Sequence, residues 1–430
     1  MPTEWLKSVD LASIERAHQQ PVDADTLGAA RRIVEDVRCG GDAALNDCIA
    51  RFEGRSAEQL VLSRDELAAA YQRLPEGVQM LLKRTAQRIE VFAAAQRACI
   101  TPMTMAIAGG EAGHDVSPVD SAACYAPGGR FPLPSSVLMT AITARVAGVS
   151  RVQVVTPSTD DIMLGAAYVA GADTLFQAGG AHAVAAVAYG TESIDPVDIV
   201  VGPGNRWVTA AKAIVNGIVG IDMLAGPSEL LVVADDSVDA DTIAADLLAQ
   251  AEHDPDARAI LVTRSPILIS AVNDAIDRQL KTLETADIAR AALNNGYAVL
   301  CDTDADMVGV VNIIAPEHLE LMGDNVERLA PDIRHYGGLF LGEHAAEVLG
   351  DYGAGPNHTL PTGGTARFTG GLSVFNFLRI RTWMRIDQLD DAQPLVNDAN
   401  ALAQLEGLRG HGRSARCRRV EISSSPAIQK

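Results

Sequence analysis

The sequence lacks any apolar run long enough to cross a membrane. A membrane-spanning helix needs about 20 predominantly apolar residues in succession, and no stretch of the 430 residues approaches that length without interruption. The beginning of the chain, MPTEWLKSVDLASIERAHQQ, carries a charge every few positions and contains no apolar core of signal-peptide length. We therefore expect an unexported protein with no membrane partner.

Positive charge is also scarce. Lys and Arg total 35 against 55 Asp and Glu, a formal net charge of -20, which disfavours nucleic acid and anionic membranes as main partners. The local exception is RGHGRSARCRR, at 409–419. We interpret it as a solvated or subunit-contact surface, with an anion-binding surface as the less favoured alternative.

The cysteines are few and scattered, and no two of them form a CxxC pair. The six are Cys39, Cys48, Cys99, Cys124, Cys301 and Cys417. This spacing suggests neither a disulfide framework nor a thiolate zinc site. It fits a reducing cytoplasm.

The remaining composition is typical of an Ala-, Val- and Gly-rich α/β enzyme. Hydrophobic residues make up 48% and charged residues 21%, aromatics only 4%, and there are 37 glycines. A chain of 430 residues exceeds the size at which single cores usually stop growing. We therefore expect two or more domains.

From about residue 122, short apolar runs are followed by Gly- or Pro-containing turns and then by Ala-rich amphipathic segments. The runs barely alternate in polarity, which predicts strands buried on both faces. With the helical segments between them they give the βαβ rhythm of parallel sheets. The predicted strands are VQVVTP, TLFQAGG, DIVVGPG, ELLVVAD, AILVTRS, AVLCDT and GLFLGE. More than six strands indicate two such sheets.

The two flanks of this region differ from it. Residues 24–97 have apolar positions at helical spacing and predict a helical entry region with no obvious chemistry. Past residue 375 the rhythm stops, and LDDAQPLVNDANALAQLEGLRGHGRSARCRR predicts one or two helices in a terminal appendage.

Two Gly-rich turns adjoin predicted strands, CYAPGGRFPLPSS at 124–136 and VVGPGNRWVTAAK at 200–212. Glycines there allow the backbone close to a ligand, and the next helix start turns N–H groups toward an anion such as a dinucleotide pyrophosphate. Neither turn has the GxGxxG pattern, so a plain tight turn is the main alternative for each.

Several polar side chains are candidates for a metal site. In LLAQAEHDP, Gln250 and His253 lie three residues apart in the last turn of a helix that Pro255 terminates, so both can face the same way. The loop GDYGAGPNHTLPTGG at 350–364 carries Asp351, an oxygen donor, and His358. The alternatives are a helix-terminal histidine favoured by the macrodipole and a structural turn.

Two further pairs stand out. Glu406 and His411 in EGLRGH have near-helical spacing, for which a solvated helix face is the simpler reading. In APEHLEL, Pro316 holds its predecessor extended, so Glu317 and His318 follow at a strand end or helix start. There the carboxylate could tune the imidazole for general-base work, or the pair could mark an exposed helix start.

Taken together, these segments resemble the histidinol dehydrogenase family. The similarity covers about 25–415, in the family's order and at about its spacing. The segments are YAPGGRFPLPSSVLM, GGAHAVAAVAYGT, VVGPGN, GIDMLAGPSELLV, DLLAQAEHDPDA, APEHLEL, GPNHTLPTGGTARF and EGLRGH. The resemblance implies NAD-dependent oxidation of L-histidinol to L-histidine through an aldehyde, with two NAD, one zinc per subunit and a homodimer.

The resemblance also implies a fold of two incomplete Rossmann-like α/β domains with parallel sheets and small N- and C-terminal helical segments. We assign 1–22 to an N-terminal helical arm and 23–124 with 230–375 to a first domain, which holds the zinc and catalytic residues. Residues 125–229 form the second, NAD-side domain, and 376–430 form an arm exchanged with the partner subunit.

By the same resemblance, each site residue acquires an expected role. The zinc ligands are Gln250, His253, Asp351 and, from the partner subunit, His411. His318 is the base that removes the hydroxyl proton, and Glu317 activates water for the aldehyde step. The other substrate contacts are Ser135, Ser228, His358 and Glu406, and the NAD contacts are Tyr125, His182 and Asn205.

Departures from the family pattern concern mainly the NAD side. His182 stands where the family commonly has Gln, and an imidazole can still donate one hydrogen bond, so we expect altered NAD affinity more than lost function. Arg206 and Trp207 replace residues that are frequently smaller or apolar, and RFTGGLSVFNFLRIRTW (367–383) departs from the usual version. The main alternative is a dehydrogenase of another polar alcohol, such as a sulfonated diol. A non-catalytic binding protein is disfavoured because every expected ligand and the base are present.

Overall fold

The computed structural model describes residues 4–16, 21–56, 59–128 and 132–420. The chain forms two units. Met1–Arg97 and Val119–Phe377 form the large unit, and Ala98–Pro118 with Leu378–Lys430 form the small unit. Within the described ranges, none of the helices combines the length and the apolar character that a membrane span requires.

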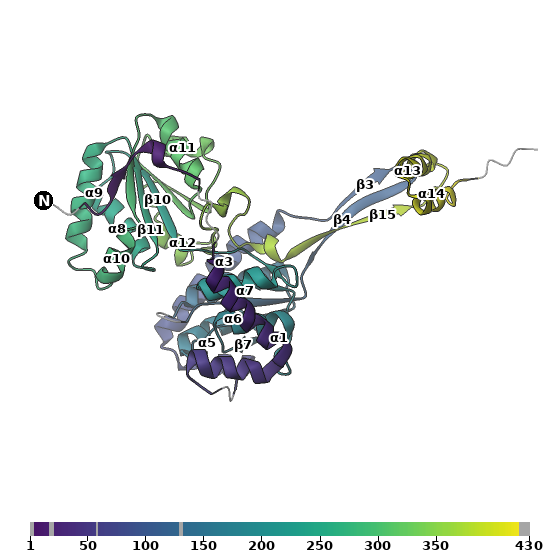
Figure 1. Cartoon of the computed structure of the whole chain (residues 1–430), viewed down its shortest axis with the longest axis horizontal. Coiled ribbons are helices and arrows are strands. Elements are labelled where there is room, and N and C mark those ends of the chain that lie inside the picture. The colour runs from purple at the N-terminus through teal and green to yellow at the C-terminus, as the bar shows by residue number, and fades with distance from the viewer. Residues whose placement is uncertain (1–3, 17–20, 57–58, 129–131, 421–430) are drawn as a thin grey trace, which may run out of the picture. The chain divides into compact units, whose positions relative to one another are not determined.

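The large unit contains two six-stranded sheets (Figure 1). Sheet A is parallel throughout. Its strands, in spatial order, are β1 (Lys7–Val9), β12 (Tyr297–Leu300), β11 (Arg258–Thr263), β10 (Glu229–Ala234), β13 (His318–Met322) and β14 (Gly338–Leu341).

Helices cover both faces of sheet A, because its central strands are apolar on both sides. On one face, α8 (Ala240–Ala251), α9 (Pro266–Gln279) and α10 (Ala286–Leu293) form a buried core with Leu230 and Leu261. On the other face, α11 (Asp304–Ile314) and the 3-10 helix η2 (Glu327–Asp332) pack on Leu231 and Val262. The short helix α12 (Glu347–Asp351) follows β14.

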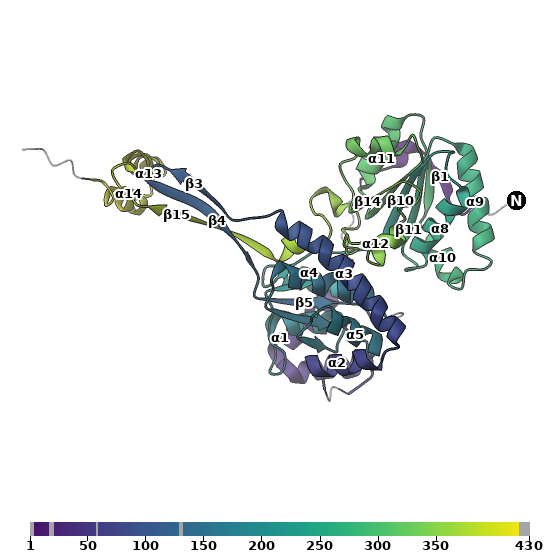
Figure 2. The ribbon, with the colours of Figure 1, turned by 180° about the vertical axis from the view of Figure 1, so that it is seen from behind.

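Sheet B is parallel except where its first strand pairs antiparallel. In spatial order its strands are β2 (Val61–Ser63), β7 (Thr174–Phe176), β6 (Arg151–Val155), β5 (Ser121–Tyr125), β8 (Ile199–Val201) and β9 (Gly220–Ile221). On one face lie α1 (Ala24–Glu53), α6 (Gly180–Tyr189) and α7 (Arg206–Val215). Against the opposite face lie α4 (Pro134–Ala147), α5 (Asp161–Val169) and α2 (Arg64–Arg73), seen from behind in Figure 2. The remaining helices of the unit are α3 (Glu76–Ala98) and the 3-10 helices η1 (Leu11–Ser13), η3 (Thr365–Arg367) and η4 (Val374–Phe377).

The small unit is an antiparallel sheet with two helices at one end of its strands (Figure 1). The sheet order is β15 (Leu378–Ile386), β4 (Gly110–Pro118) and β3 (Met103–Ile107). The helices are α13 (Gln393–Leu405) and α14 (Arg409–Arg416), which pack on each other.

The α/β class with two parallel sheets is confirmed, and all seven predicted strands are present, as β6, β7, β8, β10, β11, β12 and β14. The helical region at 24–97 is also present, as α1, α2 and α3.

Three expectations about the flanks differ from the structure. The described part of 1–22 is not a helical arm: Lys7–Val9 pairs with β12 and Leu6 is fully buried beneath sheet A. Within 23–124, α1 packs on the helices of sheet B, where it buries Val34 and Val37, and not on sheet A. The appendage also contains more than 376–430, since β4 pairs with β15 and β3 pairs with β4 in the same sheet.

Candidate functional site

Glu317 and His318 lie at the amino end of β13. Of the two locations expected from the sequence, a strand end or a helix start, the structure shows the strand end. Helix α11 ends at Ile314, the next residue Ala315 adopts a left-handed conformation (φ 52°, ψ 62°), and Pro316 cannot continue the helix. The chain therefore turns directly into the sheet. Strand β10 runs beside β13 with Leu230 opposite His318, which brings Ser228 and Glu229 to the same edge.

Glu317 is buried and held by two donors. Ser228 Oγ donates to Glu317 Oε2 at 2.6 Å, and the Glu229 N–H donates to the same oxygen at 2.9 Å. Burial raises the pKa of Glu317 to about 7, although His318 and these donors act in the opposite direction. A carboxyl group with this pKa can accept a proton near neutral pH.

His318 is buried among carboxylates. Its Nδ1 lies 3.3 Å from the Glu229 carbonyl oxygen and 3.7 Å from both Glu317 Oε2 and Glu347 Oε1. Its Nε2 lies 3.7 Å from Asp351 Oδ1 and makes no hydrogen bond to the residues that the structure describes. Burial lowers the pKa of His318, but the carboxylates, led by Glu347, outweigh burial and raise it to about 10.

Three of the four expected metal ligands meet beside this pair. Gln250 is in the last turn of α8, His253 follows the end of that helix, and Asp351 is the last residue of α12. His253 Nε2 and Asp351 Oδ2 are 3.8 Å apart. Together with Glu347, these two residues present donor atoms that all lie within 4.8 Å of one another.

The donor chemistry fits a divalent cation. With its amide nitrogen toward Glu347, Gln250 donates to Oε1 at 2.9 Å, and its oxygen lies 3.0 Å from Ser228 Oγ, which has one proton for both Gln250 and Glu317. In the opposite orientation its oxygen faces the carboxylate, an arrangement that is favourable when a cation lies between them. Nitrogen and oxygen donors with no thiolate suit zinc or manganese. The C-terminal end of α8 adds a partial negative charge.

Three of the four expected substrate contacts, Ser135, Ser228 and His358, belong to the large unit with these groups. His358 Nδ1 is 3.0 Å from the Asp351 carbonyl oxygen, and its Nε2 is 3.4 Å from the hydroxyl of Ser136. The pKa of His358 is lowered, chiefly by burial. Ser135 and Ser228 line a cavity of about 1590 Å³ in the large unit.

The expected NAD contacts line the same cavity, which also reaches His253. Tyr125 is the last residue of β5, and its hydroxyl accepts from the Gly180 N–H at 3.2 Å. Asn205 caps α7 by accepting from the N–H groups of Trp207 and Val208. The turn before it requires glycine, because Gly202 has φ 110° and a Cβ there would lie 2.1 Å from the Tyr125 carbonyl oxygen.

His182 pairs with a residue that no sequence motif indicated. Its Nε2 lies 2.9 Å from Glu53 Oε1, and its ring stacks on Phe52 with centroids 5.9 Å apart. Glu53 also accepts from the Gly179 N–H at 3.0 Å and from Arg55 Nε at 2.9 Å. Despite burial, these partners lower the pKa of Glu53.

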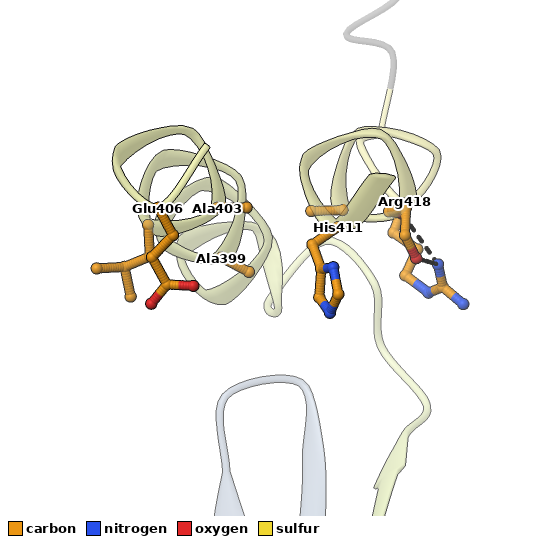
Figure 3. Close-up of a pocket in the computed structure, with 8 residues that line it drawn as sticks. Ala399, Ala403, Glu406, His411 and Arg418 are labelled. Carbon is orange, nitrogen blue, oxygen red and sulfur yellow. Dashed lines mark hydrogen bonds between the residues drawn. The ribbon is translucent and has the colours of Figure 1, made fainter. Parts of the chain in front are cut away.

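Glu406 and His411 belong to the small unit. Figure 3 shows both side chains projecting on the same side of the helix pair, where they line a pocket of about 310 Å³. They are not on one helix, since α13 ends at Leu405, Gly407 adopts φ 75°, and α14 begins at Arg409.

Sequence reasoning missed the acidic residues around His318. Glu347 is hidden in the ordinary segment HAAEVLGD, and Glu320 reads as an alternating strand position. Both are buried, and burial raises the pKa of Glu320 to about 8 and that of Glu347 well above its usual range. The sequence could have indicated Glu320, because it lies two residues after His318 and the two side chains of a strand at this spacing share one face.

Sheet B has a glycine turn before a helix start. Sheet A has a buried Glu–His pair beside nitrogen and oxygen donors. This combination is that of an oxidoreductase. The comparisons with known proteins agree with this class. A family model described as histidinol dehydrogenase matches residues 16–419. The chain therefore belongs to the histidinol dehydrogenase family, enzymes of histidine biosynthesis.

The relatives match over nearly their whole length. The histidinol dehydrogenase of Pseudomonas syringae pv. syringae is 46% identical over 394 residues, which is 90% of this chain and 88% of that protein. The histidinol dehydrogenase of Methanothermobacter thermautotrophicus is 44% identical over 94% of this chain and 96% of its own. The crystal structure of the Elizabethkingia anophelis enzyme superposes with a TM-score of 0.89 at 31% identity, covering 97% of this chain and 98% of that one.

Proposed function

We propose that this histidinol dehydrogenase performs a four-electron oxidation, L-histidinol to L-histidine through L-histidinal, with two NAD and one zinc per subunit. The observation that carries the proposal is the His318 imidazole. Its Nε2 is buried without a hydrogen-bond partner among the described residues and faces Asp351, which lies beside His253. The substrate alternative is another polar alcohol, such as a sulfonated diol.

The proposed metal ligands are Gln250, His253, Asp351 and, from the partner subunit, His411. When bound, zinc supplies a positive charge that holds the substrate's imidazole and amino nitrogens, so that the carbinol stays near His318. The donor set of His253, Glu347 and Asp351 supports a cation here. Neutralisation of these carboxylates would also return the pKa of His318 toward the range of a base.

We assign the proton chemistry to Glu317 and His318. NAD, when bound, supplies the hydride acceptor in both steps. His318 takes the hydroxyl proton of the alcohol as the hydride leaves C1, which gives the aldehyde. Glu317 then takes a proton from water as the water oxygen adds to the aldehyde carbon, while protonated His318 returns its proton to the former carbonyl oxygen, which gives the hydrate. His318 takes a hydroxyl proton of this hydrate as the second hydride leaves, which gives the acid.

The remaining contacts are proposed by role. Ser135, Ser228, His358 and Glu406 hold the substrate, and Tyr125, His182 and Asn205 hold NAD. These roles are supported by the fact that all of these residues except His358 and Glu406 line the cavity of the large unit. Absence of nucleic-acid partners and a cytoplasmic location remain predictions from charge and cysteine usage.

We further propose a homodimer in which the small unit contributes Glu406 and His411 to the partner's site. Its surface supports this, since apolar side chains are exposed on both its sheet and its helices: Met105, Ile380, Met384, Leu402 and Leu405. Mixing subunits of His318→Asn and His411→Ala would test it. Regained activity in mixed dimers supports shared sites, whereas two variants that stay inactive after verified subunit exchange contradict them.

The proposed reaction is tested by the NADH yield per L-histidinol, run to completion with zinc-loaded protein beside a sulfonated diol. Two NADH per histidinol, lost with a chelator and restored by zinc, is the expected result. Oxidation of the diol without turnover of histidinol would assign the scaffold to a different substrate.

A further inference from the structure

Helix α12 carries two groups that face His318, yet little apolar packing holds it. It spans five residues, of which only Glu347 and Gly350 are buried, while Val348 is 40% and Leu349 56% exposed. The buried Gly350 lies so close to Phe340 that a Cβ would meet its ring at 2.8 Å. The contact between Gly350 and the Phe340 ring does not fix α12 by itself, so the position of the helix must depend on polar partners.

Glu320 supplies such a partner at the start of α12. It lies on the same face of β13 as His318 and is 1% exposed. Its Oε1 accepts from the Glu347 N–H at 2.7 Å. This N–H is the first of the helix and has no acceptor inside it. The other oxygen of Glu320, Oε2, is buried with no partner in the described structure.

A buried acid with one unsatisfied oxygen is costly for folding alone. An apolar side chain of similar size would fill the same space at a lower cost in desolvation, so stability does not explain a glutamate at this place. What Glu320 provides is the hydrogen bond to α12.

The two ends of α12 show what this hydrogen bond controls. At its start, Glu347 lies 3.7 Å from His318 Nδ1 and 2.9 Å from the Gln250 amide. At its end, Asp351 lies 3.8 Å from His253 Nε2 and 3.7 Å from His318 Nε2. Moving this short helix would shift both carboxylates relative to the base and to the expected metal ligands.

We infer that Glu320 is a positioning residue, which sets α12 so that Glu347 orients His318 and Asp351 completes the metal-binding group. The inference rests on the proposed zinc site. Glu320 does not itself touch substrate or metal. Outer residues of this kind cost about 10- to 100-fold in metal affinity or activity when they are changed.

The test compares Glu320→Met with Glu320→Gln. The methionine removes the acceptor, whereas the glutamine can keep an oxygen toward the Glu347 N–H. We expect Glu320→Met to weaken zinc binding at least about tenfold, measured by chelator competition, and to lower kcat for histidinol, with the KM for NAD unchanged. Glu320→Gln should stay within about threefold of wild type. Glu343→Met, at an exposed glutamate four residues before Glu347, is the matched control.

Several outcomes would overturn the inference. These are unchanged zinc affinity and kcat in Glu320→Met, an equal loss in Glu320→Gln, or a parallel rise in the KM for NAD, which would indicate general damage. Wild-type protein that neither binds zinc nor oxidises histidinol would instead refute the proposed function. If Glu320→Met does not fold, hydrogen exchange in wild type decides: a protected Glu347 amide supports the inference, and rapid exchange refutes it.

Discussion

Sheets A and B have similar architecture but place their candidate functional residues at opposite edges. In sheet B, Tyr125 ends β5, and the turn from Gly202 to Asn205 follows β8, so these residues lie at the carboxyl ends of the strands. In sheet A, Ser228 precedes β10 and His318 begins β13, so these candidate residues lie at the amino ends of the strands.

The ends of the neighbouring helices explain this difference. At the carboxyl edge of a parallel sheet the following helix begins, and its N–H groups favour an anion such as a dinucleotide pyrophosphate. At the amino edge the preceding helix ends, and its carbonyl groups favour a cation. Helix α8 ends at this edge with Gln250 and His253, and helix α7 begins at the other with Asn205 as its cap.

The buried charges follow the same division. Sheet A and its loops bury Glu229, Glu317, Glu320 and Glu347, which a cation would stabilise. Sheet B buries the pair Lys212 and Asp222, whose charges balance each other. The comparison predicts that changes at the amino edge of sheet A affect proton transfer and metal binding, whereas changes in sheet B affect NAD binding.

His318→Asn should have the largest effect. The variant loses the proposed base of both oxidations, so kcat for histidinol and for histidinal should each fall about 10²- to 10⁴-fold. NAD affinity, measured by fluorescence titration, should stay at the wild-type value because sheet B is untouched. A variant that still oxidises one of the two substrates at the wild-type rate would refute the shared role.

Glu317→Gln should affect mainly the second oxidation, that of the aldehyde to the acid. Oxidation of histidinal should slow about 10²-fold, and that of histidinol much less, because only the aldehyde needs hydration. Since burial raises the pKa of Glu317 to about 7, its basic form increases as pH rises through about 7. The wild-type histidinal rate should rise over this interval, and the variant should lose this limb. Equal losses in both halves would contradict the assignment.

Lys212→Met tests the other side of the comparison. Lys212 is 2% exposed and donates to Asp222 and, at 3.0 Å, to the Gly202 carbonyl oxygen. Its loss leaves a buried carboxylate unpaired, which should lower the free energy of unfolding by about 3–5 kcal/mol. It should also raise the KM for NAD, because the Gly202 carbonyl loses its donor and Gly202 keeps only the hydrogen bond from its N–H to Asp222.

The control for this variant is Lys281→Met, at an exposed lysine that pairs with Asp277. It should leave both the denaturation midpoint and the KM for NAD unchanged. Zinc affinity should be that of wild type in both lysine variants. If Lys212→Met lost zinc but kept its NAD affinity, the division between the sheets would be wrong.

The sequence predicted those parts of the fold and of the candidate site that have a buried apolar pattern or a local motif. Strands such as β10 were predictable because they are apolar on both faces. Strand β3 was missed because its residues are nearly all exposed and carry no such pattern. Glu317 and His318 are adjacent in the sequence, but Glu347 approaches His318 only through the pairing of β13 with β14 and the turn into α12. Such contacts have no local signal.

His182→Gln should have the smallest effect and gives the finest test of the comparison. The Gln amide can donate to Glu53 as the imidazole does. The free energy of NAD binding should therefore change by at most about the contribution of one hydrogen bond. That corresponds to less than about a tenfold change in the KM for NAD, with zinc affinity and kcat unchanged. A loss above about 100-fold would show that the imidazole itself binds the dinucleotide. Glu53 would then act as the partner of a ligand rather than as a structural anchor of sheet B.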